Sequence, residues 1–348
     1  MLARRAFTNV FNTVKELDAV MTEAAVVTDF SIGDMWKQLP QYTARANEFG
    51  LAIKDVYEAD TLFYQQGLKT NEVVALSNET MKMARIAGLD TADATDRMTN
   101  ALRGFNMELN ETNAQNVADV YSELAAISAS NVNELSVAMT KTASIASNAG
   151  ASFENTAAFI AQIVETTRES AETAGTALKT VIARFTELKK DPSEIGEVDG
   201  EVVDANKIET ALRSVGVALR DSNGEFRDFD DVILELSGKW DSLDVNTQRY
   251  IATIAAGSRQ QSRFIALMSN NARLTQLTAA ANSAAGASQK QYEKTLESLE
   301  TKLNRLKNAA NEFLTTIGNS DVIKGAIDML TGLLNILNKA TSWGPRWI

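Results

Sequence analysis

The sequence predicts an all-α protein: a multi-helix bundle of glycine-punctuated helical hairpins, with one small β-hairpin near residues 217–229 and a C-terminal coiled-coil helix. Three observations lead to this class. The 348 residues include only 3 prolines and 18 glycines, so long stretches contain no helix-breaking residue. Apolar residues recur at steps of three and four along much of the chain, which is helical spacing. Glycine stands where several of these patterns stop.

The patterns divide the chain into four parts. We expect an N-terminal helical body over residues 1–190, an acidic loop and β-hairpin over 191–230, a helical segment over 231–286, and a coiled coil with a terminal amphipathic helix over 287–348. The length allows one large or two ordinary domains. An apolar content of 45%, much of it alanine, is enough for a core.

The first helix is predicted from "MLARRAFTNVFNTVKEL". One helical face collects Phe7, Val10, Phe11, Val14 and Leu17. The two arginines of this stretch also suit a transit peptide. Acidic residues follow by Glu23, however, which favours an ordinary amphipathic helix.

Glycines mark helix ends in the N-terminal body. Helical patterns stop at Gly50, Gly88 and Gly150, where a left-handed C-cap costs a glycine nothing. A residue able to cap the next helix soon follows two of them, Asp90 or Thr91 after Gly88 and Ser152 after Gly150. The sequence therefore predicts helix-turn-helix units at these positions.

A shift of 62 positions brings residues 71–88 onto residues 133–150. Six residues then find an identical partner: Asn71, Glu72, Thr80, Ala84, Ala87 and Gly88. The match suggests an internal 62-residue repeat, although identities in alanine-rich helices also arise from composition alone.

The longest helical pattern of this part runs over residues 152–190. Large apolar residues at both ends flank a centre of alanine, threonine, serine and Gly175. We expect a core helix that crosses a neighbour closely at this centre, because small residues permit close approach.

The pattern breaks between residues 191 and 230. Pro192, two glycines and several acids over 191–207 predict an exposed loop. Asn223-Gly224 within 217–229 is a strong signal for a hairpin turn. The run Asp221-Ser222-Asn223-Gly224 also resembles the start of a calcium loop, but it lacks the later acidic ligand, so a plain turn is favoured.

A helical segment follows, with a short helix near "DFDDVILELSGKWDSL" and Trp240 as a core anchor. The stretch "IATIAAGSRQQSRFIALMSNN" then has the outline of a DNA-reading helix-turn-helix, with a turn at Gly257. Charge argues against that function. Residues 258–348 hold 11 basic and 6 acidic residues, a net charge of +5, on a chain of net charge −11. We expect no specific nucleic-acid binding, and we expect Arg259 and Arg263 to pair with the acidic body.

The clearest periodicity lies over residues 287–318. Apolar residues alternate in steps of four and three, which is a heptad seam that requires a partner helix from another copy or from the same chain. We expect this seam to mediate self-association, and its residues are Tyr292, Leu296, Leu299, Leu303, Leu306, Ala310, Phe313 and Ile317. The last helix, 321–340, is amphipathic, with burial against a helix favoured over contact with a membrane surface.

The missing residue types exclude most catalytic chemistry. The chain contains no cysteine and no histidine, which removes thiolate nucleophiles, cysteine-ligated zinc and every Ser-His-Asp arrangement. Carboxylate-only chemistry would have to use Glu165, Glu169 and Glu172, whose spacing is typical of a solvated helix face. We expect no catalytic, metal-binding or cofactor-binding residues and no cofactors. No apolar run is long enough to span a membrane, so membrane contact has no support from a spanning segment.

Five stretches in order resemble the conserved core of tape measure proteins from long-tailed bacteriophages and prophages. They are "ELDAVMTEAAVVTDFS", "YTARANEFGLAIKDVYEADTLFYQQGL", "SIASNAGASFENTAAFIAQIVETTRESAETAGTALKTVIARF", "LRDSNGEFRDFDDVILELSGKWDSL" and "RYIATIAAGSRQQSRFIALMSN". The resemblance covers roughly residues 16–317. Members of this family usually extend beyond both ends of the matching stretch.

This resemblance implies a structural protein of the virion rather than an enzyme. Tape measure proteins occupy the lumen of the tail tube, set tail length and leave ahead of the DNA. It also implies two partners, the tail tube protein and tail assembly chaperones, and a location in the host cytoplasm during assembly and in the virion afterwards. Two other function classes remain open from the residues alone, a generic helical scaffold and a membrane-interacting ejection protein.

Overall fold

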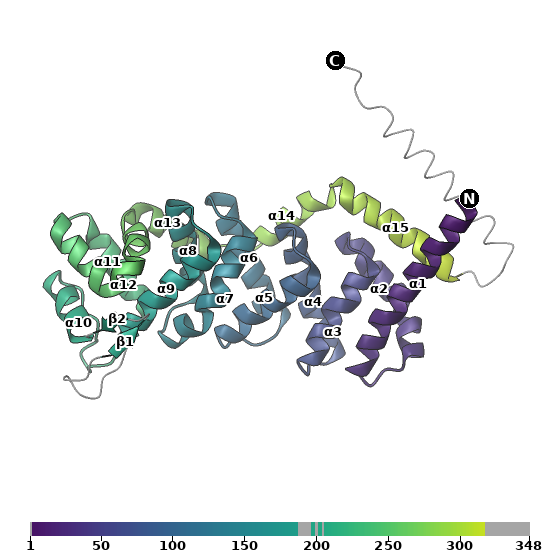
Figure 1. Cartoon of the computed structure of the whole chain (residues 1–348), viewed down its shortest axis with the longest axis horizontal. Coiled ribbons are helices and arrows are strands. Elements are labelled where there is room, and N and C mark those ends of the chain that lie inside the picture. Colours follow the sequence, from purple (N-terminus) through teal and green to yellow (C-terminus); the bar gives the residue numbers. More distant parts are fainter. Residues whose placement is uncertain (1, 187–195, 199–200, 204, 317–348) are drawn as a thin grey trace, which may run out of the picture. The chain divides into compact units, whose positions relative to one another are not determined.

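The computed structural model describes residues 2–186, 196–198, 201–203 and 205–316, and its helices confirm the predicted all-α class (Figure 1). The helices are α1 Leu2–Val26, α2 Ile32–Phe49, α3 Ile53–Gln65, α4 Thr70–Ala87, α5 Thr91–Gly104, α6 Glu111–Ile127, α7 Val132–Asn148, α8 Phe153–Thr167, α9 Ala171–Thr186, α10 Ala205–Ser214, α11 Phe229–Trp240, α12 Val245–Met268, α13 Asn271–Ala281, α14 Ala287–Leu296 and α15 Leu299–Thr316; the strands are β1 Gly196–Val198 and β2 Glu201–Val203. The chain divides into two compact units, unit 1 with residues 1–73 and 294–348 and unit 2 with residues 74–293.

The predicted glycine turns are confirmed. Gly50, Gly88 and Gly150 have φ of 65°, 66° and 77°, the left-handed region in which glycine carries no Cβ penalty. Asp90 and Ser152 then act as N-caps, because their side-chain oxygens accept hydrogen bonds from the backbone N–H groups three residues later. The helix ends are thus set by local chemistry that is readable in the sequence.

The helix boundaries follow the 62-residue shift. Helices α4 and α5 begin at residues 70 and 91, and α7 and α8 begin at 132 and 153. The matched residues also have matched roles. Glu72 and Glu134 each accept a hydrogen bond from the backbone N–H three residues earlier, and Thr80 and Thr142 each donate to the carbonyl four residues earlier. Duplication as the origin of this correspondence stays a prediction.

The described part of the pattern over residues 152–190, which ends at residue 186, forms two helices, so the prediction of one long helix is wrong. Helix α8 ends at Thr167, Arg168 adopts a left-handed conformation with φ of 57°, and α9 begins at Ala171. Ser170 accepts a hydrogen bond from the backbone N–H of Thr173 at 3.3 Å and so caps α9. The Arg168 guanidinium donates to the backbone oxygen of Ala129 in the α6–α7 turn. This tertiary contact accounts for a non-glycine residue in this conformation.

The close crossing predicted at Gly175 is confirmed. A Cβ atom on Gly175 of α9 would lie 2.4 Å from the backbone oxygen and 2.9 Å from the Cα of Ala138 on α7. On the other side of α7, a Cβ atom on Gly104 of α5 would lie 2.4 Å from the Cβ of Ala143. Helices α5, α7 and α9 therefore pack as neighbours in unit 2, with backbones held close by glycine (Figure 1).

The core of unit 2 is centred on α8. Every residue of this helix from Thr156 to Val164 is buried, and so is Phe153 at its start. A chain of aromatic contacts runs through Phe159, Phe229, Phe185, Phe264 and Trp240, with ring centroids 5.4–6.4 Å apart. Trp240 is 2% exposed, which confirms it as a core anchor.

Unit 1 combines α1, α2 and α3 with α15. Tyr42 of α2 and Tyr57 of α3 stack with parallel rings, and Tyr57 donates a hydrogen bond to the backbone oxygen of Met35 at 2.9 Å. Arg45 forms a bidentate ion pair with Asp60, at 2.6 and 3.0 Å, beside these rings. Burial raises the pKa of both tyrosines above their usual range. The phenol groups therefore stay neutral near pH 7.

The region around residues 191–230 differs in part from the expectation. Residues 196–198 and 201–203 were predicted as loop but form a two-stranded antiparallel ladder, with Gly196 opposite Val203. Near 217–229 the turn is at Asn223-Gly224 as predicted, and its ladder is a single antiparallel bridge between Arg220 and Phe226. The Asp221 carboxylate accepts hydrogen bonds from the backbone N–H groups of Asn223 and Glu225. This is a plain turn, as the sequence favours.

Candidate functional site

The predicted heptad seam lies on two helices rather than one. Tyr292 is buried on α14, and Leu296 is the last residue of that helix. Helix α15 begins after Ser298, whose hydroxyl accepts a hydrogen bond from the backbone N–H of Thr301 at 3.2 Å. The expectation of one continuous helix over 287–318 is therefore wrong, because Ser298 caps a new helix inside the pattern. Ser298 within the pattern was the sequence signal for this break, because serine is a common N-cap residue.

The remaining seam residues differ in exposure. Leu303 is 42% exposed and Leu306 is half-buried on α15. The side chains of Leu299, Ala310 and Phe313 and the whole of Ile317 lie outside the described part of the chain. The terminal helix predicted over 321–340 also lies outside it.

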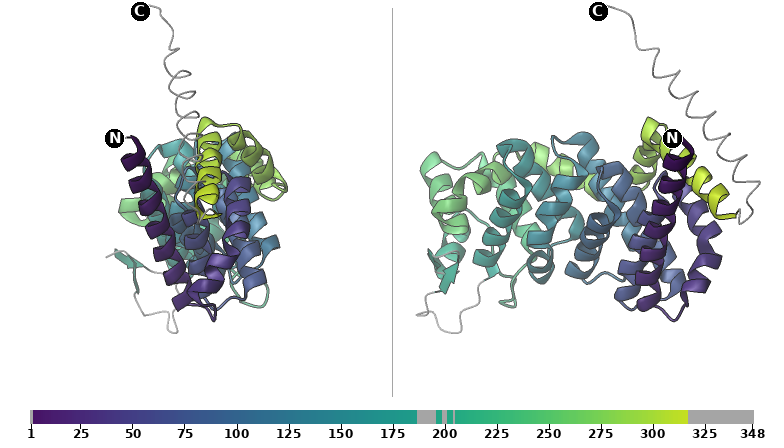
Figure 2. Two further views of the ribbon diagram at one scale, coloured as in Figure 1. Left: turned by 90° about the vertical axis from the view of Figure 1, so that its right-hand side faces the viewer. Right: turned by 45° about the vertical axis from the view of Figure 1, so that its right-hand side comes forward.

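Within unit 1, helix α15 docks on the end of α2 through polar side chains instead. Asn304 donates to the backbone oxygen of Gly50 at 2.8 Å, and Asn308 donates to that of Leu51 at 2.8 Å. Arg305 donates to the backbone oxygen of Asn47 at 2.7 Å. The acceptors lie at the end of α2 and just after it, where helix carbonyls have no partner within the helix. We call this contact, between residues 301–308 and residues 47–51, the α15 latch; Figure 2 shows α15, in yellow-green, beside the purple N-terminal helices.

The latch is tightly packed although it is polar. Thr301 and Asn308 are fully buried. A Cβ atom on Gly50 would lie 2.6 Å from Cγ2 of Thr301. Sequence reasoning missed this site, but a signal was present: Thr301, Asn304 and Asn308 are spaced by three and four, and so form a polar stripe on one helical face.

The stretch with the DNA-reader outline is used inside the protein. Gly257 has φ of 71° and ψ of 172°, which confirms the predicted turn within residues 245–268. Arg263 forms a bidentate ion pair with Glu169, at 2.6 and 2.7 Å, which confirms the predicted pairing for this arginine. Gln261 donates to the backbone oxygen of Arg249. Arg263 thus joins α12 to the α8–α9 turn, and Gln261 joins the two parts of α12 across Gly257.

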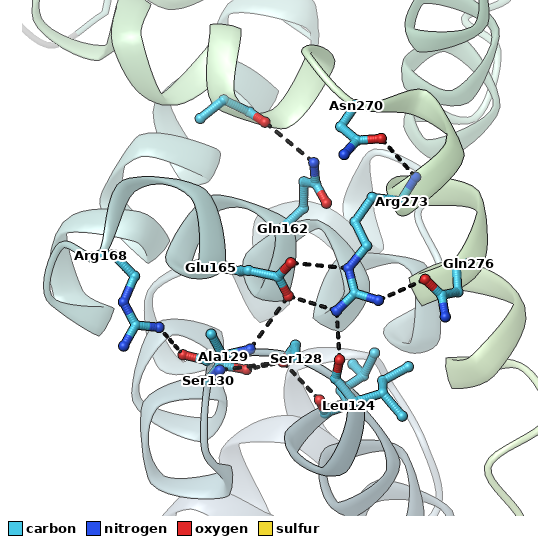
Figure 3. A network of polar contacts seen from close by, with 12 residues as sticks. Leu124, Ser128, Ala129, Ser130, Gln162, Glu165, Arg168, Asn270, Arg273 and Gln276 are labelled. Atoms are coloured by element: carbon cyan, nitrogen blue, oxygen red, sulfur yellow. Dashed lines mark hydrogen bonds and ion pairs between the residues drawn. The ribbon is translucent and has the colours of Figure 1, made fainter.

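A second arginine builds a larger network, drawn in Figure 3. Arg273 of α13 donates to both carboxylate oxygens of Glu165, at 3.0 and 2.7 Å, and to the backbone oxygen of Ile127 at 2.5 Å. Glu165 in turn accepts from the backbone N–H of Ala129. The network fastens the α6–α7 turn to α8 and α13.

Hydrogen bonds from Arg273 hold the pKa of the Glu165 carboxyl below its usual value, against the opposing effect of partial burial. A lowered pKa in the folded state means that the pair stabilises the fold above the unfolded-state pKa of about 4.3, and that this stabilisation is lost as the pH falls through the folded-state pKa.

We expect Glu165→Gln to lower the free energy of unfolding by about 1 kcal/mol at pH 7. The difference from the unmodified protein should shrink as the pH falls through the folded-state pKa of Glu165 and vanish below it, where Glu165 is protonated in both folded and unfolded chains. Urea unfolding across this pH range measures it. Glu172→Gln is the matched control, since Glu172 is exposed, and it should change stability by less than about 0.5 kcal/mol. A Glu165 effect that is independent of pH would contradict the ionic origin.

Two buried carboxylates also serve as structural acceptors. Asp119 on α6 accepts hydrogen bonds from the backbone N–H groups of Gly286 and Ser288, at 2.8 and 2.9 Å, and from the Ser288 hydroxyl. Asp230 on α11 accepts from the backbone and hydroxyl of Ser152 and from Asn155. Their oxygens are thus engaged by donors of neighbouring elements, a positioning role rather than a reactive one.

Among the described residues, no group of three or more Asp, Glu, His or Cys side chains is arranged to hold a metal ion. No helix in the described part of the chain is both long and apolar enough to cross a membrane. The polar side chains described above instead join segments that are distant in sequence.

Comparison with known proteins gives a consistent result. The model of the family described as "Phage-related minor tail protein" matches residues 45–257. A protein named "Tape measure protein", from Pneumococcus phage Dp-1, is 22% identical over 293 residues. That match covers 84% of this chain and 24% of the relative, so the chain spans about a quarter of the relative's length. No solved structure matches the chain.

The family match runs from within α2 to the turn at Gly257 and so includes the helical hairpins at Gly88 and Gly150, the α7–α9 crossing and the two acids that pair with Arg263 and Arg273. It covers more than half of the 348 residues. The chain therefore belongs to the phage-related minor tail protein family, and over most of its own length it is similar to a protein named as a tape measure protein.

Proposed function

We propose that this chain is the folded core of a tape measure protein, which occupies the lumen of the tail tube, sets tail length and leaves ahead of the DNA. The observation that carries the proposal is the family match across the helical hairpins, supported by the named relative. Its role is assembly rather than catalysis. Its proposed partners are the tail tube protein and, in the host cytoplasm before assembly, tail assembly chaperones.

The helical architecture suits a length gauge. An α-helix rises about 1.5 Å per residue, so 348 residues in one continuous helix would span on the order of 520 Å. Most described helices are joined by short turns with glycine or a capping residue. Opening these turns would convert hairpins into a string of helices, if the tube wall and neighbouring helices replaced the internal packing.

The α15 latch would be the first contact to open in such a conversion. It joins residues about 250 positions apart, so the segments cannot move apart along the tube while it is closed. Its hydrogen bonds are polar and exchangeable with water, so opening it costs less than exposing an apolar surface of the same size. We propose that the α15 latch is closed before assembly and open once the chain lies in the tube.

A change in residue number within residues 276–294 should change tail length. Deleting 11 residues from this stretch in the native phage should shorten tails by about 16 Å, and inserting 11 helix-forming residues between the exposed Asn282 and Ser283 should lengthen them by about 16 Å. Electron micrographs of many tails measure the shift.

The control replaces exposed residues of the same stretch without changing their number, and its tails should keep their normal length. Tails of unchanged length after both the deletion and the insertion would reject the length-setting role for this region, and assembly or ejection would remain.

We also propose that the predicted seam residues of α15, among them the exposed Leu303, mediate self-association. Leu303 is 42% exposed. It lies on the face of α15 that the latch does not use. Replacing Leu299 and Leu303 by asparagine should abolish association of the chain in analytical ultracentrifugation, because a polar pair removes the apolar contact of the seam. Lys302→Ala, on the exposed surface of the same helix, is the control. An oligomer that survives the double substitution would show that the contact lies elsewhere.

A further inference from the structure

A basic hollow lies on unit 2 where α5, α7 and α9 are neighbours. Its volume is about 550 Å³. The lining includes three cationic side chains, Arg103 from α5, Lys141 from α7 and Lys179 from α9, together with the polar side chains of Asn106, Ser144 and Asn148. No carboxylate is among the lining residues.

The glycine contacts of α7 bring these charges together. Gly104 packs against Ala143, and Gly175 packs against Ala138. These contacts draw α5 and α9 against opposite sides of α7, so that cations from three helices converge on one opening. The three cationic side chains therefore lie together because the helix backbones are tightly packed. Rotation of surface side chains alone would not separate the helices that carry them.

Two of the cations, Lys141 and Lys179, have no charged or hydrogen-bonding partner in the described part of the chain. Arg103 lies in the last turn of α5, where a positive charge offsets the helix dipole. Lys141 and Lys179 lie in the middle of their helices and are exposed, and within the described residues neither has a hydrogen bond or an ion pair. Together with Arg103 these two lysines give the hollow a local positive charge on a chain of net charge −11.

We propose that this hollow binds a short acidic segment of a partner protein, with carboxylates on Lys141 and Lys179. The amide and hydroxyl groups of Asn106, Ser144 and Asn148 would hydrogen-bond to the backbone of such a segment. The net negative charge of the chain favours a short acidic peptide over a long polyanion as the ligand. A long polyanion such as DNA is repelled by the acidic body beyond the hollow, whereas a short peptide meets only the local positive field.

The probe is a fluorescent hexaglutamate peptide, titrated against the full chain at low ionic strength and read by fluorescence anisotropy. Lys141→Ala combined with Lys179→Ala should weaken binding roughly tenfold, by loss of two charge pairs. Lys54→Ala combined with Lys290→Ala is the matched control, because both lysines are exposed and the net charge changes equally. It should weaken binding less than about twofold.

Equal weakening by both pairs would overturn the proposal, since it would reflect net charge rather than the hollow. Failure of the unmodified chain to bind the peptide would overturn it as well. Stronger binding of double-stranded DNA, lost on substitution of Lys141 and Lys179, would assign the hollow to nucleic acid instead. The test uses the isolated chain, so its outcome is independent of whether the protein sets tail length.

Discussion

Replacing Gly175 by alanine is expected to lower the free energy of unfolding by about 2–3 kcal/mol. The new Cβ atom would lie 2.4 Å from the backbone oxygen of Ala138, and a backbone atom cannot rotate away as a side chain can. Helices α7 and α9 would have to separate, which loosens the neighbouring core contacts. Chemical denaturation of the purified protein, followed by circular dichroism, measures the change.

Gly238→Ala is the matched control. Gly238 also lies within a helix, α11, but a Cβ atom there would meet nothing within 4 Å. Alanine has the higher helix propensity, so this substitution should raise stability by about 0.5–1 kcal/mol. Similar destabilisation by both substitutions would mean that the α7–α9 backbones are not in close contact.

Replacing Gly50 by alanine is expected to open the α15 latch and to cost about 2–4 kcal/mol in total. About 1–2 kcal/mol comes from the left-handed conformation, and the rest from the overlap with Thr301. Gly88 has nearly the same φ, and a Cβ atom added there would meet nothing within 4 Å. Gly88→Ala should therefore carry the conformational cost alone.

Hydrogen–deuterium exchange of residues 301–308 reports the latch directly. Gly50→Ala should speed exchange there, and Gly88→Ala should not. Adding Thr301→Ala should relieve most of the overlap and bring the cost of Gly50→Ala close to that of Gly88→Ala. Unchanged protection of residues 301–308 in Gly50→Ala would contradict the docking of α15 at this glycine.

Local chemistry explains which parts of the fold the sequence predicts. Gly50, Gly88 and Gly150 stand at helix ends because each needs a left-handed residue, and that need is visible without knowledge of the neighbours. The close crossing at Gly175 is likewise predictable from small residues between large ones. The same holds for the turn at Gly224.

The features that were missed depend on partners distant in the sequence. Arg168 ends α8 in a conformation secured by the backbone oxygen of Ala129. Asn304 is half-buried and Asn308 is buried, because carbonyls at the end of α2 need donors. A heptad pattern reveals only the apolar face of α15, so it cannot show that the polar face is the one that docks. The basic hollow likewise requires three helices to be placed before Lys141 and Lys179 are seen together.

A chain with a locked latch tests the central claim most directly, namely that the closed latch must open for the chain to act in the tube. The chain has no cysteine, so Glu48→Cys and Arg305→Cys would create one unique pair. Both positions are exposed, and they lie on the two sides of the latch, where the Arg305 guanidinium now donates to the backbone oxygen of Glu48 at 3.5 Å. A short bismaleimide linker would then join α2 to α15. The locked and unlocked proteins would be added to an extract of cells infected with a phage that lacks this protein, and tails would be measured by electron microscopy.

The account predicts that the unlocked double variant and both single variants treated with the linker support tails of normal length, whereas the locked chain supports none or only short ones. Tails of normal length assembled around the locked chain would contradict it, because the α15 latch would then remain closed inside the tube.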